Sequence, residues 1–552
     1  MQLSRRAFAG GALSLAAGSQ LGSPAFAQAR PELSAAIAAI GAYAEAHRRY
    51  FNLPGLTLGL TTPDGFATVL DFGYANADAR TPIRPDTLFQ VGSISKCMTA
   101  AVIHQLAAEG KLRLDSRVAD LLPAVPLPPG SAITVQHLLD HTAGLPDSAP
   151  MFADGGLWTG YVPMAHWHYS NTGYDILGKV AEHAGGKPLA RLLAERLFAP
   201  LGMTRSRGAI VGADRTLYAQ GYEAADPTTV FARGTPLAPA AWVDVTFGAG
   251  SVASTADDMT RFMRSLANAV QGRGGLGLSP EQGKLFTTHF VPSDTPGMRY
   301  GNGLMQVGNG GRSYLHHTGG MVSFSSAFHL DVASGVGAFA SSTISAFAQY
   351  RPRLLTRWAV DALTDAQAGR QPPTPPPLAV PVPSPAAYIG RYSGPQGAFE
   401  VRPGNPLKIV NRNGEADIQP WGGDIFRTRH PDFRMFSLMF ERTRGFVTGA
   451  SSGGASFVKQ GMAGTVPRSN AALAQLAGRY VNDSPWIGTA LVVERGGKLW
   501  LGTETPMTKI GDNQWRVGQE SWSPERGSFA NFIDGRPQTF IFSGEKFLRH
   551  DL

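Results

Sequence analysis

The segment FQVGSISKCMT, residues 89–99, decides how the rest of the chain is interpreted. It places Ser93 and Lys96 three residues apart at the start of a predicted helix, so both side chains lie on one face, one turn apart. A serine hydroxyl is a weak nucleophile until a base removes its proton. A lysine buried at a helix N-terminus has a lowered pKa, because burial and the helix dipole both disfavour its cation. The segment therefore predicts a serine nucleophile with a base beside it.

A second segment, HWHYSNTGYDILGKV at residues 166–180, supplies partners for this pair. Tyr169 stands just before a predicted helix, and a tyrosine next to the lysine relays protons to a leaving group. We expect Asn171 to hydrogen-bond both Lys96 and a substrate amide. The neighbouring His166 and His168 are predicted to flank the cleft, and Trp167 is either a core residue or a wall that faces the substrate.

A third segment, YLHHTGGMVSFSSAFHL at residues 314–330, contains His317, Gly319 and Gly320 at a predicted strand. Glycines without side chains let a strand backbone lie close to a substrate. We expect the backbone N–H groups of Gly320 and Ser93 to form an oxyanion hole, which stabilises the negative charge that develops on a carbonyl oxygen under attack.

Ser-x-x-Lys, Tyr-x-Asn and His-Thr-Gly, in this order, resemble the serine β-lactamase and penicillin-binding-protein family. Segments typical of its class C-type branch cover nearly all of residues 35–360. The resemblance implies a multidomain α/β (α+β) chain whose catalytic domain has an antiparallel sheet flanked by helices and a helical subdomain. It further implies that Ser93 is the acylated nucleophile and that Lys96 and Tyr169 share the acid/base work. By the same resemblance Asn171 positions the reacting groups, and His317 and Gly319 lie on the strand that lines the cleft.

The third motif narrows the substrate class. β-Lactamases and many penicillin-binding proteins have a lysine where this chain has His317, and a histidine is mostly neutral near pH 7. This weakens the case for a β-lactamase or a D-Ala-D-Ala carboxypeptidase. His-x-Gly is seen in D-aminopeptidase-type and esterase-like members of the family. In this family a Pro-Gly pair is common ahead of the tyrosine motif, whereas this chain has Pro163-Met164. The difference affects the turn expected before Tyr169 and not the chemistry of the motif residues.

The Pro-rich segment 367–385 separates this part from a glycine-rich, strand-like C-terminal part, because dense proline favours a stiff extended linker. YIGRYSG at 388–394 recurs as LAGRYVN at 476–482, each followed by a hairpin pattern. We predict two short antiparallel barrels rather than one larger sandwich. The predicted units are a signal peptide at 1–29, a hydrolase domain at 30–366, the linker at 367–385, and barrel modules at 386–470 and 471–552.

This layout resembles the D-aminopeptidases, in which two lipocalin-like barrels follow the catalytic domain and a loop of the last barrel shapes the amine-binding end. The resemblance implies a serine hydrolase that acts through an acyl-enzyme on amide or ester bonds, with an aminopeptidase for D-amino-acid peptides as one form. Alternatives are a carboxylesterase, a D-Ala-D-Ala carboxypeptidase or β-lactamase, and a non-catalytic receptor for peptidoglycan fragments. Two observations count against a close match to the D-aminopeptidases. Those enzymes are usually described without an export signal, and similar β modules follow many uncharacterised hydrolases of this family.

The first 29 residues contain Arg5-Arg6, a mild apolar stretch and small residues up to Ala29. They resemble a bacterial twin-arginine signal, which predicts export to the periplasm. A net charge of +8 suits a polyanionic neighbour such as the cell wall. The sequence contains no stripe of arginine and lysine interleaved with aromatic residues, so it does not predict nucleic-acid binding. It also contains no apolar run that approaches the roughly 20 residues that span a membrane. We expect a small peptide, amide or ester substrate and no cofactor.

Several other patterns are set aside. GASSG at 449–453 matches Gly-x-Ser-x-Gly but precedes a predicted strand, so we interpret it as a glycine loop. His137 and His141 lack a third metal ligand, so we predict no metal. Cys97, the single cysteine, is predicted to pack in the core without a disulfide. Ser254 and Asp257 predict a helix capping box.

Overall fold

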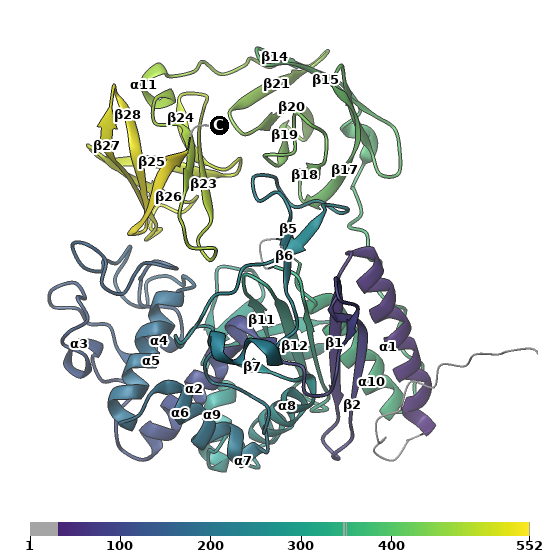
Figure 1. The fold of residues 1–552 in the computed structure, drawn as a ribbon, viewed down its shortest axis with the longest axis vertical. Helices are drawn as coiled ribbons and strands as arrows, with labels where there is room; N and C mark the ends of the chain where they lie inside the picture. The colour runs from purple at the N-terminus through teal and green to yellow at the C-terminus, as the bar shows by residue number, and fades with distance from the viewer. Residues whose placement is uncertain (1–30, 346–347, 349, 551–552) are drawn as a thin grey trace, which may run out of the picture.

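The computed structural model describes residues 31–345, 348 and 350–550, so the predicted signal peptide lies outside the described residues. Its catalytic domain is built on a nine-stranded sheet in the order β3-β2-β1-β13-β12-β11-β10-β9-β8 (Figure 1). Every pairing in this sheet is antiparallel. In this order the strands are Thr81–Pro82, Ala67–Asn76, Gly55–Thr61, Gly337–Ser342, Ser325–Asp331, Arg312–Gly320, Leu304–Asn309, Met298–Gly301 and Val291–Pro292.

Helices cover both faces of this sheet. Helices α1 (Pro31–Tyr50) and α10 (Arg353–Gln367) pack together on one face. Helices α8 (Ala256–Val270) and α2 (Ser95–Ala108) lie on the other. The central strands β1, β12 and β13 are buried along their whole length, as expected for a sheet covered on both sides. This agrees with the predicted fold class.

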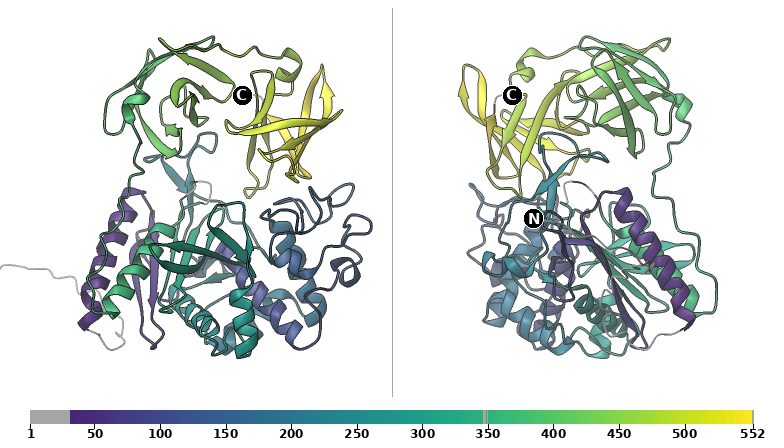
Figure 2. Two further views of the ribbon diagram at one scale, coloured as in Figure 1. Left: turned by 180° about the vertical axis from the view of Figure 1, so that it is seen from behind. Right: turned by 45° about the vertical axis from the view of Figure 1, so that its right-hand side comes forward.

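A helical subdomain packs beside α2 and the sheet (Figures 1 and 2). Helix α5 (Asn171–Gly185) ends at Gly186, whose φ of +66° is the left-handed conformation that glycine adopts readily. The helix predicted to begin just after Tyr169 is therefore present. The other helical segments are α3 (Val118–Leu121), α4 (Val135–Leu139), α6 (Leu189–Leu193), η2 (Ala194–Phe198), α7 (Ala199–Leu201), η3 (Gly212–Leu217) and α9 (Pro280–Thr288). Short pairs join β4 (Phe89–Gln90) to β7 (Ala253–Ser254) and β5 (Tyr222–Ala224) to β6 (Leu237–Pro239).

The C-terminal part forms two closed eight-stranded antiparallel barrels, as predicted, and not one sandwich. The first contains β14 (Gly390–Gly394), β15 (Gly397–Arg402), β16 (Lys408–Asn411), β17 (Gly414–Gly422), β18 (Ile425–Thr428), β19 (Leu438–Thr443), β20 (Phe446–Ser452) and β21 (Ala455–Lys459). The second contains β22 (Gly478–Val481), β23 (Thr489–Arg495), β24 (Lys498–Leu501), β25 (Thr505–Gly511), β26 (Gln514–Val517), β27 (Arg526–Ile533), β28 (Arg536–Phe542) and β29 (Glu545–His550). The short segments η5 (Pro385–Ala387) and α11 (Ala471–Ala474) lead into the barrels.

The Gly-Arg-Tyr repeat has the same structural role in both barrels. Tyr392 and Tyr480 are fully buried. Their hydroxyls donate at 2.7 Å to the carbonyl oxygens of Tyr388 and Leu476, each four residues earlier. Each tyrosine therefore fixes the entry of its barrel while filling the core with an aromatic ring.

Two local predictions are wrong. The GASSG segment is not a loop: its first four residues end strand β20, and the turn falls at Gly453 and Gly454 before β21. The cap of α8 is shifted by one residue, because Thr255, not Ser254, accepts the hydrogen bond from the Asp258 N–H. Ser254 instead belongs to β7.

The linker packs on the catalytic domain. Carbonyl oxygens of Pro373 and Pro376 accept hydrogen bonds from Trp358 and Tyr43, both at 3.0 Å. Among the described residues, no helix is long and apolar enough to cross a membrane.

Candidate active site

Ser93 lies in a single 3-10 turn, η1 (Gly92–Ile94), which runs directly into α2. The turn begins at Gly92 with φ of +56°. A Cβ at Gly92 would lie 2.7 Å from the Gly320 nitrogen, so only glycine lets the turn approach β11 this closely. Lys96 stands one turn later, with its Nζ 3.1 Å from Ser93 Oγ.

Lys96 is fully buried and held on three sides. Besides Ser93, its Nζ contacts Asn171 Oδ1 at 2.6 Å and the Ala249 carbonyl oxygen at 3.0 Å. Burial lowers the pKa of Lys96 to about 7, against the opposing negative charges of Asp175 and Asp147. A lysine with a pKa near neutrality is present partly as the free amine, which can accept the serine proton.

Tyr169 lies over the amine, with Lys96 Nζ 4.7 Å from its ring centroid. Burial raises the pKa of Tyr169, although a hydrogen bond with Ser93 and the charge of Arg351 act in the opposite direction. The phenol is therefore protonated near neutral pH. In this arrangement Lys96 can accept a proton and Tyr169 can donate one.

Strand β11 passes beside the nucleophile turn. A Cβ at Gly319 would lie 1.9 Å from the Val91 carbonyl oxygen. Ser326, the cross-strand partner of Gly319, donates to the same oxygen at 2.8 Å. We expected Gly319 to admit a substrate, but its missing side chain is required instead by contact with the nucleophile segment. The same contact brings the backbone of Gly320 to Gly92, next to Ser93, where the oxyanion hole was predicted.

His317 is buried in the strand and does not carry a positive charge near pH 7. Burial, followed by the positive charge of Lys96, lowers its pKa to about 3. Its Nε2 lies 3.2 Å from the Tyr300 hydroxyl, and its Nδ1 lies 2.7 Å from the Thr318 carbonyl oxygen. The position where the resemblance implied a lysine in β-lactamases therefore carries no positive charge near pH 7 in this chain.

Asn171 connects Lys96 to a pair of acids, Asp147 and Glu525, that the sequence did not indicate. Its Nδ2 donates to Asp147 Oδ1 at 2.9 Å. The backbone N–H of Asp147 donates at 2.7 Å to Oε1 of Glu525, a residue of the second barrel. Glu525 also accepts from His168 Nε2 at 3.0 Å and from Ser543. Two hydrogen bonds, with Asp147 as the one residue between them, thus link the amide that holds Lys96 to the second barrel.

The surroundings of Asp147 and Glu525 shift the pKa values of their carboxyl groups in opposite directions. Burial opposes ionisation of Glu525, but hydrogen bonds from His168, Ser543 and the Asp147 N–H together lower its pKa below the usual range. Burial, reinforced by the negative charge of Glu525, raises the pKa of Asp147. Glu525 is therefore the fixed negative charge on this side of the site.

The segment that carries Glu525 docks through aromatic rings. Trp522 stacks on His166 with ring centroids 4.5 Å apart and meets Tyr161 edge-on. Trp158 Nε1 donates to the Pro524 carbonyl oxygen at 2.7 Å. His166 and His168, which we predicted to flank the cleft, both contact the second barrel. Trp167 is nearly buried and packs against Tyr300, which makes it mainly a core residue.

The residues set aside in the sequence have structural contacts. His137 Nδ1 accepts from the Thr134 N–H in a helix cap. His141 Nδ1 accepts from the Ser170 N–H, and its ring lies 4.4 Å from that of Tyr169. The part of the chain that the structure describes contains no cluster of three side chains able to hold a metal ion. The Cys97 thiol is buried, and burial raises its pKa, which makes it a poor nucleophile.

A serine hydrogen-bonded to a buried lysine, beside a strand of an antiparallel sheet, is the arrangement expected of a hydrolase of the β-lactamase fold. The Beta-lactamase family profile matches residues 27–363, and the chain belongs to this family. The chain is 33% identical over 155 residues to Penicillin-binding protein 4* of Bacillus subtilis, a match that covers 25% of this chain and 34% of that protein. It is 32% identical over 188 residues to Esterase EstB of Burkholderia gladioli, covering 29% of this chain and 47% of the esterase.

These matches span less than half the length of either relative, so the relatives do not establish the substrate of this chain. Among solved structures, an octameric penicillin-binding protein homologue from Pyrococcus abyssi aligns with a TM-score of 0.53 and 22% identity. The alignment covers 77% of this chain and all of that chain. At this identity the likeness shows the fold alone.

Proposed function

We propose that the protein is a serine hydrolase that acts through an acyl-enzyme on amides whose acyl part carries a free amine, with D-amino-acid amides and peptides as the preferred class. One observation carries the proposal: buried Lys96 is bound to Ser93 on one side and, through Asn171, to the acids Asp147 and Glu525 on the other. An ammonium group next to the scissile carbonyl is attracted by this negative flank.

The proposed acylation begins when Lys96 takes the proton of the Ser93 hydroxyl. Oγ attacks the carbonyl carbon, and the backbone N–H groups of Ser93 and Gly320 stabilise the oxyanion. The bond to the leaving nitrogen breaks as Tyr169 gives it a proton, and Lys96 restores the proton to Tyr169. Water then attacks the ester of Ser93 in the reverse sense, releasing the acid and the free serine.

Two alternatives each have support. An esterase uses the same steps on an oxygen leaving group, and neutral His317 imposes no demand for a substrate carboxylate. A carboxypeptidase needs a cation for that carboxylate. Arg351 is a candidate, because its charge acts on Tyr169. Its guanidinium, however, also donates to Ser325 Oγ and to the Tyr350 carbonyl oxygen.

The test is a substrate panel with the wild type and Ser93→Ala. It contains D- and L-alanine p-nitroanilide, N-acetyl-D-alanine p-nitroanilide, a short acyl p-nitrophenyl ester, D-Ala-D-Ala and nitrocefin. Serine-dependent cleavage that prefers the D-anilide with a free amine supports the proposal. Full activity of Ser93→Ala contradicts the mechanism, and equal rates on the free and acetylated anilides contradict the amine preference.

We further propose that the chain is exported to the periplasm by a twin-arginine signal, on the evidence of Arg5-Arg6 and the residues that follow. Fractionation of cells that express the full chain tests this, with Arg5→Lys/Arg6→Lys as the variant. Equal periplasmic amounts of both proteins would contradict it.

A further inference from the structure

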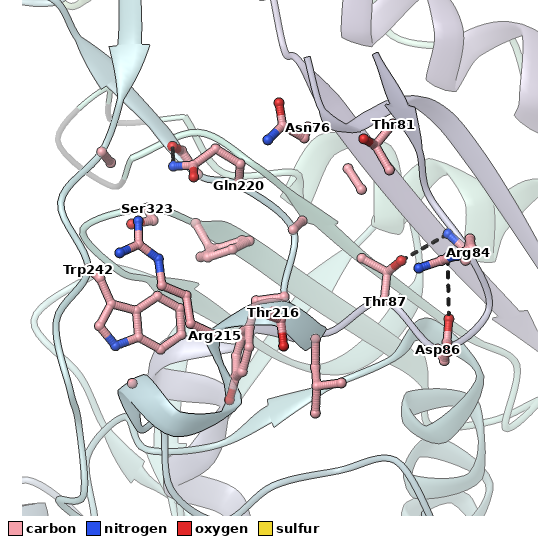
Figure 3. A pocket seen from close by; sticks show the side chains of 18 of the residues that line it. Asn76, Thr81, Arg84, Asp86, Thr87, Arg215, Thr216, Gln220, Trp242 and Ser323 are labelled. Atoms are coloured by element: carbon pink, nitrogen blue, oxygen red, sulfur yellow. Dashed lines mark hydrogen bonds and ion pairs between the residues drawn. The ribbon is translucent and has the colours of Figure 1, made fainter. Parts of the chain in front are cut away.

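A separate hollow of about 610 Å³ lies in the hydrolase domain, beside the turn that follows β11 (Figure 3). Its walls come from the β2–β3 hairpin, η3 and the segments that follow η3 and β6. Its floor includes Ser323 and Phe324, in the turn after β11. The volume falls in the range of small-molecule sites, roughly 300–1,000 Å³.

The hollow does not belong to the catalytic cleft. Ser93, Lys96 and Tyr169 are not among the residues that line it. At its inner wall the backbone of Gly221 lies against the turn, since a Cβ at Gly221 would be 2.1 Å from Ser323 Cβ. The hollow and the candidate active site are therefore formed by different residues.

Two arginines give the hollow its charge. Figure 3 shows Arg84 on one side and Arg215 on the other. Asp86 is the one acidic residue in the lining, and it lies 3.9 Å from Arg84, a weak exposed pair. Arg215 has no acidic partner within the lining. The lining therefore carries one positive charge in excess, and arginine is suited to bind a carboxylate through two parallel hydrogen bonds.

The rest of the lining consists of neutral polar groups and aromatic rings. Asn76, Thr81, Thr87, Thr216, Gln220 and Ser323 offer hydroxyl and amide groups. Trp242 stands next to Arg215, whose guanidinium carbon is 5.8 Å from its ring centroid. Tyr218, which is 9% exposed, packs edge-on against Trp242, and its buried hydroxyl has no hydrogen-bond partner among the described residues.

We propose that this hollow is a second ligand site, distinct from the catalytic site, and that it binds a carboxylate-bearing saccharide. Arg215 would hold the carboxylate, and the indole of Trp242 beside it would cover an apolar sugar face. Arg84, on the opposite side, would bind the far end of the saccharide together with the threonines and amides. The chain's net charge of +8 favours encounter with such an anion. The site would hold the hydrolase on an acidic glycan while the catalytic cleft acts on its own substrate.

The test measures binding by calorimetry with Ser93→Ala, so that no turnover occurs. The probes are cellobiouronic acid, digalacturonic acid and neutral cellobiose. We expect at least one acid to bind about tenfold more tightly than cellobiose, because a charge-assisted hydrogen bond to arginine at an exposed site contributes at the lower end of its range. We expect Arg84→Gln and Arg215→Gln each to weaken the acid about fivefold to tenfold.

Arg113→Gln is the matched control. Arg113 is 79% exposed and pairs with Asp115 two residues later, as Arg84, 73% exposed, does with Asp86. Unchanged binding of the acid by Arg113→Gln supports the site. A loss of acid binding as large as in Arg84→Gln and Arg215→Gln overturns it. The absence of binding by both acids also overturns it, as does equal binding of acid and cellobiose.

Hydrolysis separates this proposal from the proposed function. Arg215→Gln should keep wild-type kcat/KM on the anilide, because Arg215 is not part of the catalytic machinery. If the acid inhibits wild-type hydrolysis competitively, with the same dissociation constant, it occupies the catalytic cleft and the second site is refuted. If Ser93→Ala retains hydrolysis while the acid still binds, the proposed function fails and the second site stands.

Discussion

Replacing Glu525 by glutamine tests whether the second barrel contributes to substrate recognition. The carboxylate accepts three hydrogen bonds, from the Asp147 N–H, His168 and Ser543. Its side chain is only 14% exposed, so solvent screens it little. Glutamine has nearly the same shape but only one oxygen, and it carries no charge. At least one donor loses its acceptor, and an ammonium group of the substrate loses the fixed negative charge on the Asn171 side.

A hydrogen bond to a buried charged group contributes about 1.5–3 kcal/mol. Each 1.36 kcal/mol corresponds to a tenfold change in rate. We therefore expect Glu525→Gln to lower kcat/KM on D-alanine p-nitroanilide by roughly ten- to 150-fold. The acetylated anilide has no ammonium, so its kcat/KM should fall much less.

Asp154→Asn is the matched control for loosening of the barrel. Asp154 forms an ion pair at 2.8 Å with Lys546 of the second barrel, but the Asp154 side chain is 88% exposed. Such a pair contributes about 0–1 kcal/mol, so both substrates should change little. Equal losses on the free and acetylated anilides in Glu525→Gln would refute the reasoning, because Glu525 would then act through domain docking alone.

Three further predictions concern the site and its supports. On the acetylated anilide, kcat/KM should rise with pH through about 7 and then level off, because Lys96 must lose its proton to act as base; a profile that falls between pH 6 and 8 would contradict this. Gly319→Ala should lower kcat/KM and the thermal midpoint, with a cost of about 1–3 kcal/mol, because its Cβ collides with the nucleophile segment. Gly308→Ala, whose Cβ meets nothing closer than 3.8 Å, should be near neutral in both measurements. Trp522→Ala should expose the segment around residue 522 to limited proteolysis, whereas Trp486→Ala, on the same barrel and 38% exposed, should not.

The geometry of the candidate site was predictable because its residues lie in short local patterns. Ser93 and Lys96 are one turn apart, and Tyr169 and Asn171 share the start of α5, so sequence spacing fixes most of their geometry. The barrels were predictable from the repeat, since each conserves the tyrosine that binds a carbonyl oxygen four residues back.

The acid flank was not predictable by the same reasoning. Asp147 and Glu525 are separated by 378 residues, and neither belongs to a spacing pattern. Their contact depends on how two separately folded units dock, which is decided by surfaces such as the Trp522–His166 stack. Gly319 illustrates a related limit, because a glycine in a strand indicates close approach but does not reveal which atom approaches.

Asn171 explains why the barrel and the lysine belong to one functional unit. Its Oδ1 accepts from Lys96, and its Nδ2 donates to Asp147, so the two ends of one amide connect these two residues. If the Asp147 backbone moves, the amide turns and the lysine loses one of its three contacts. Glu525 prevents that movement by accepting the Asp147 N–H, and the barrel in turn holds Glu525 through Ser543. We therefore expect a change in barrel docking to reach Lys96 through Asp147 and Asn171, although neither barrel touches the lysine itself.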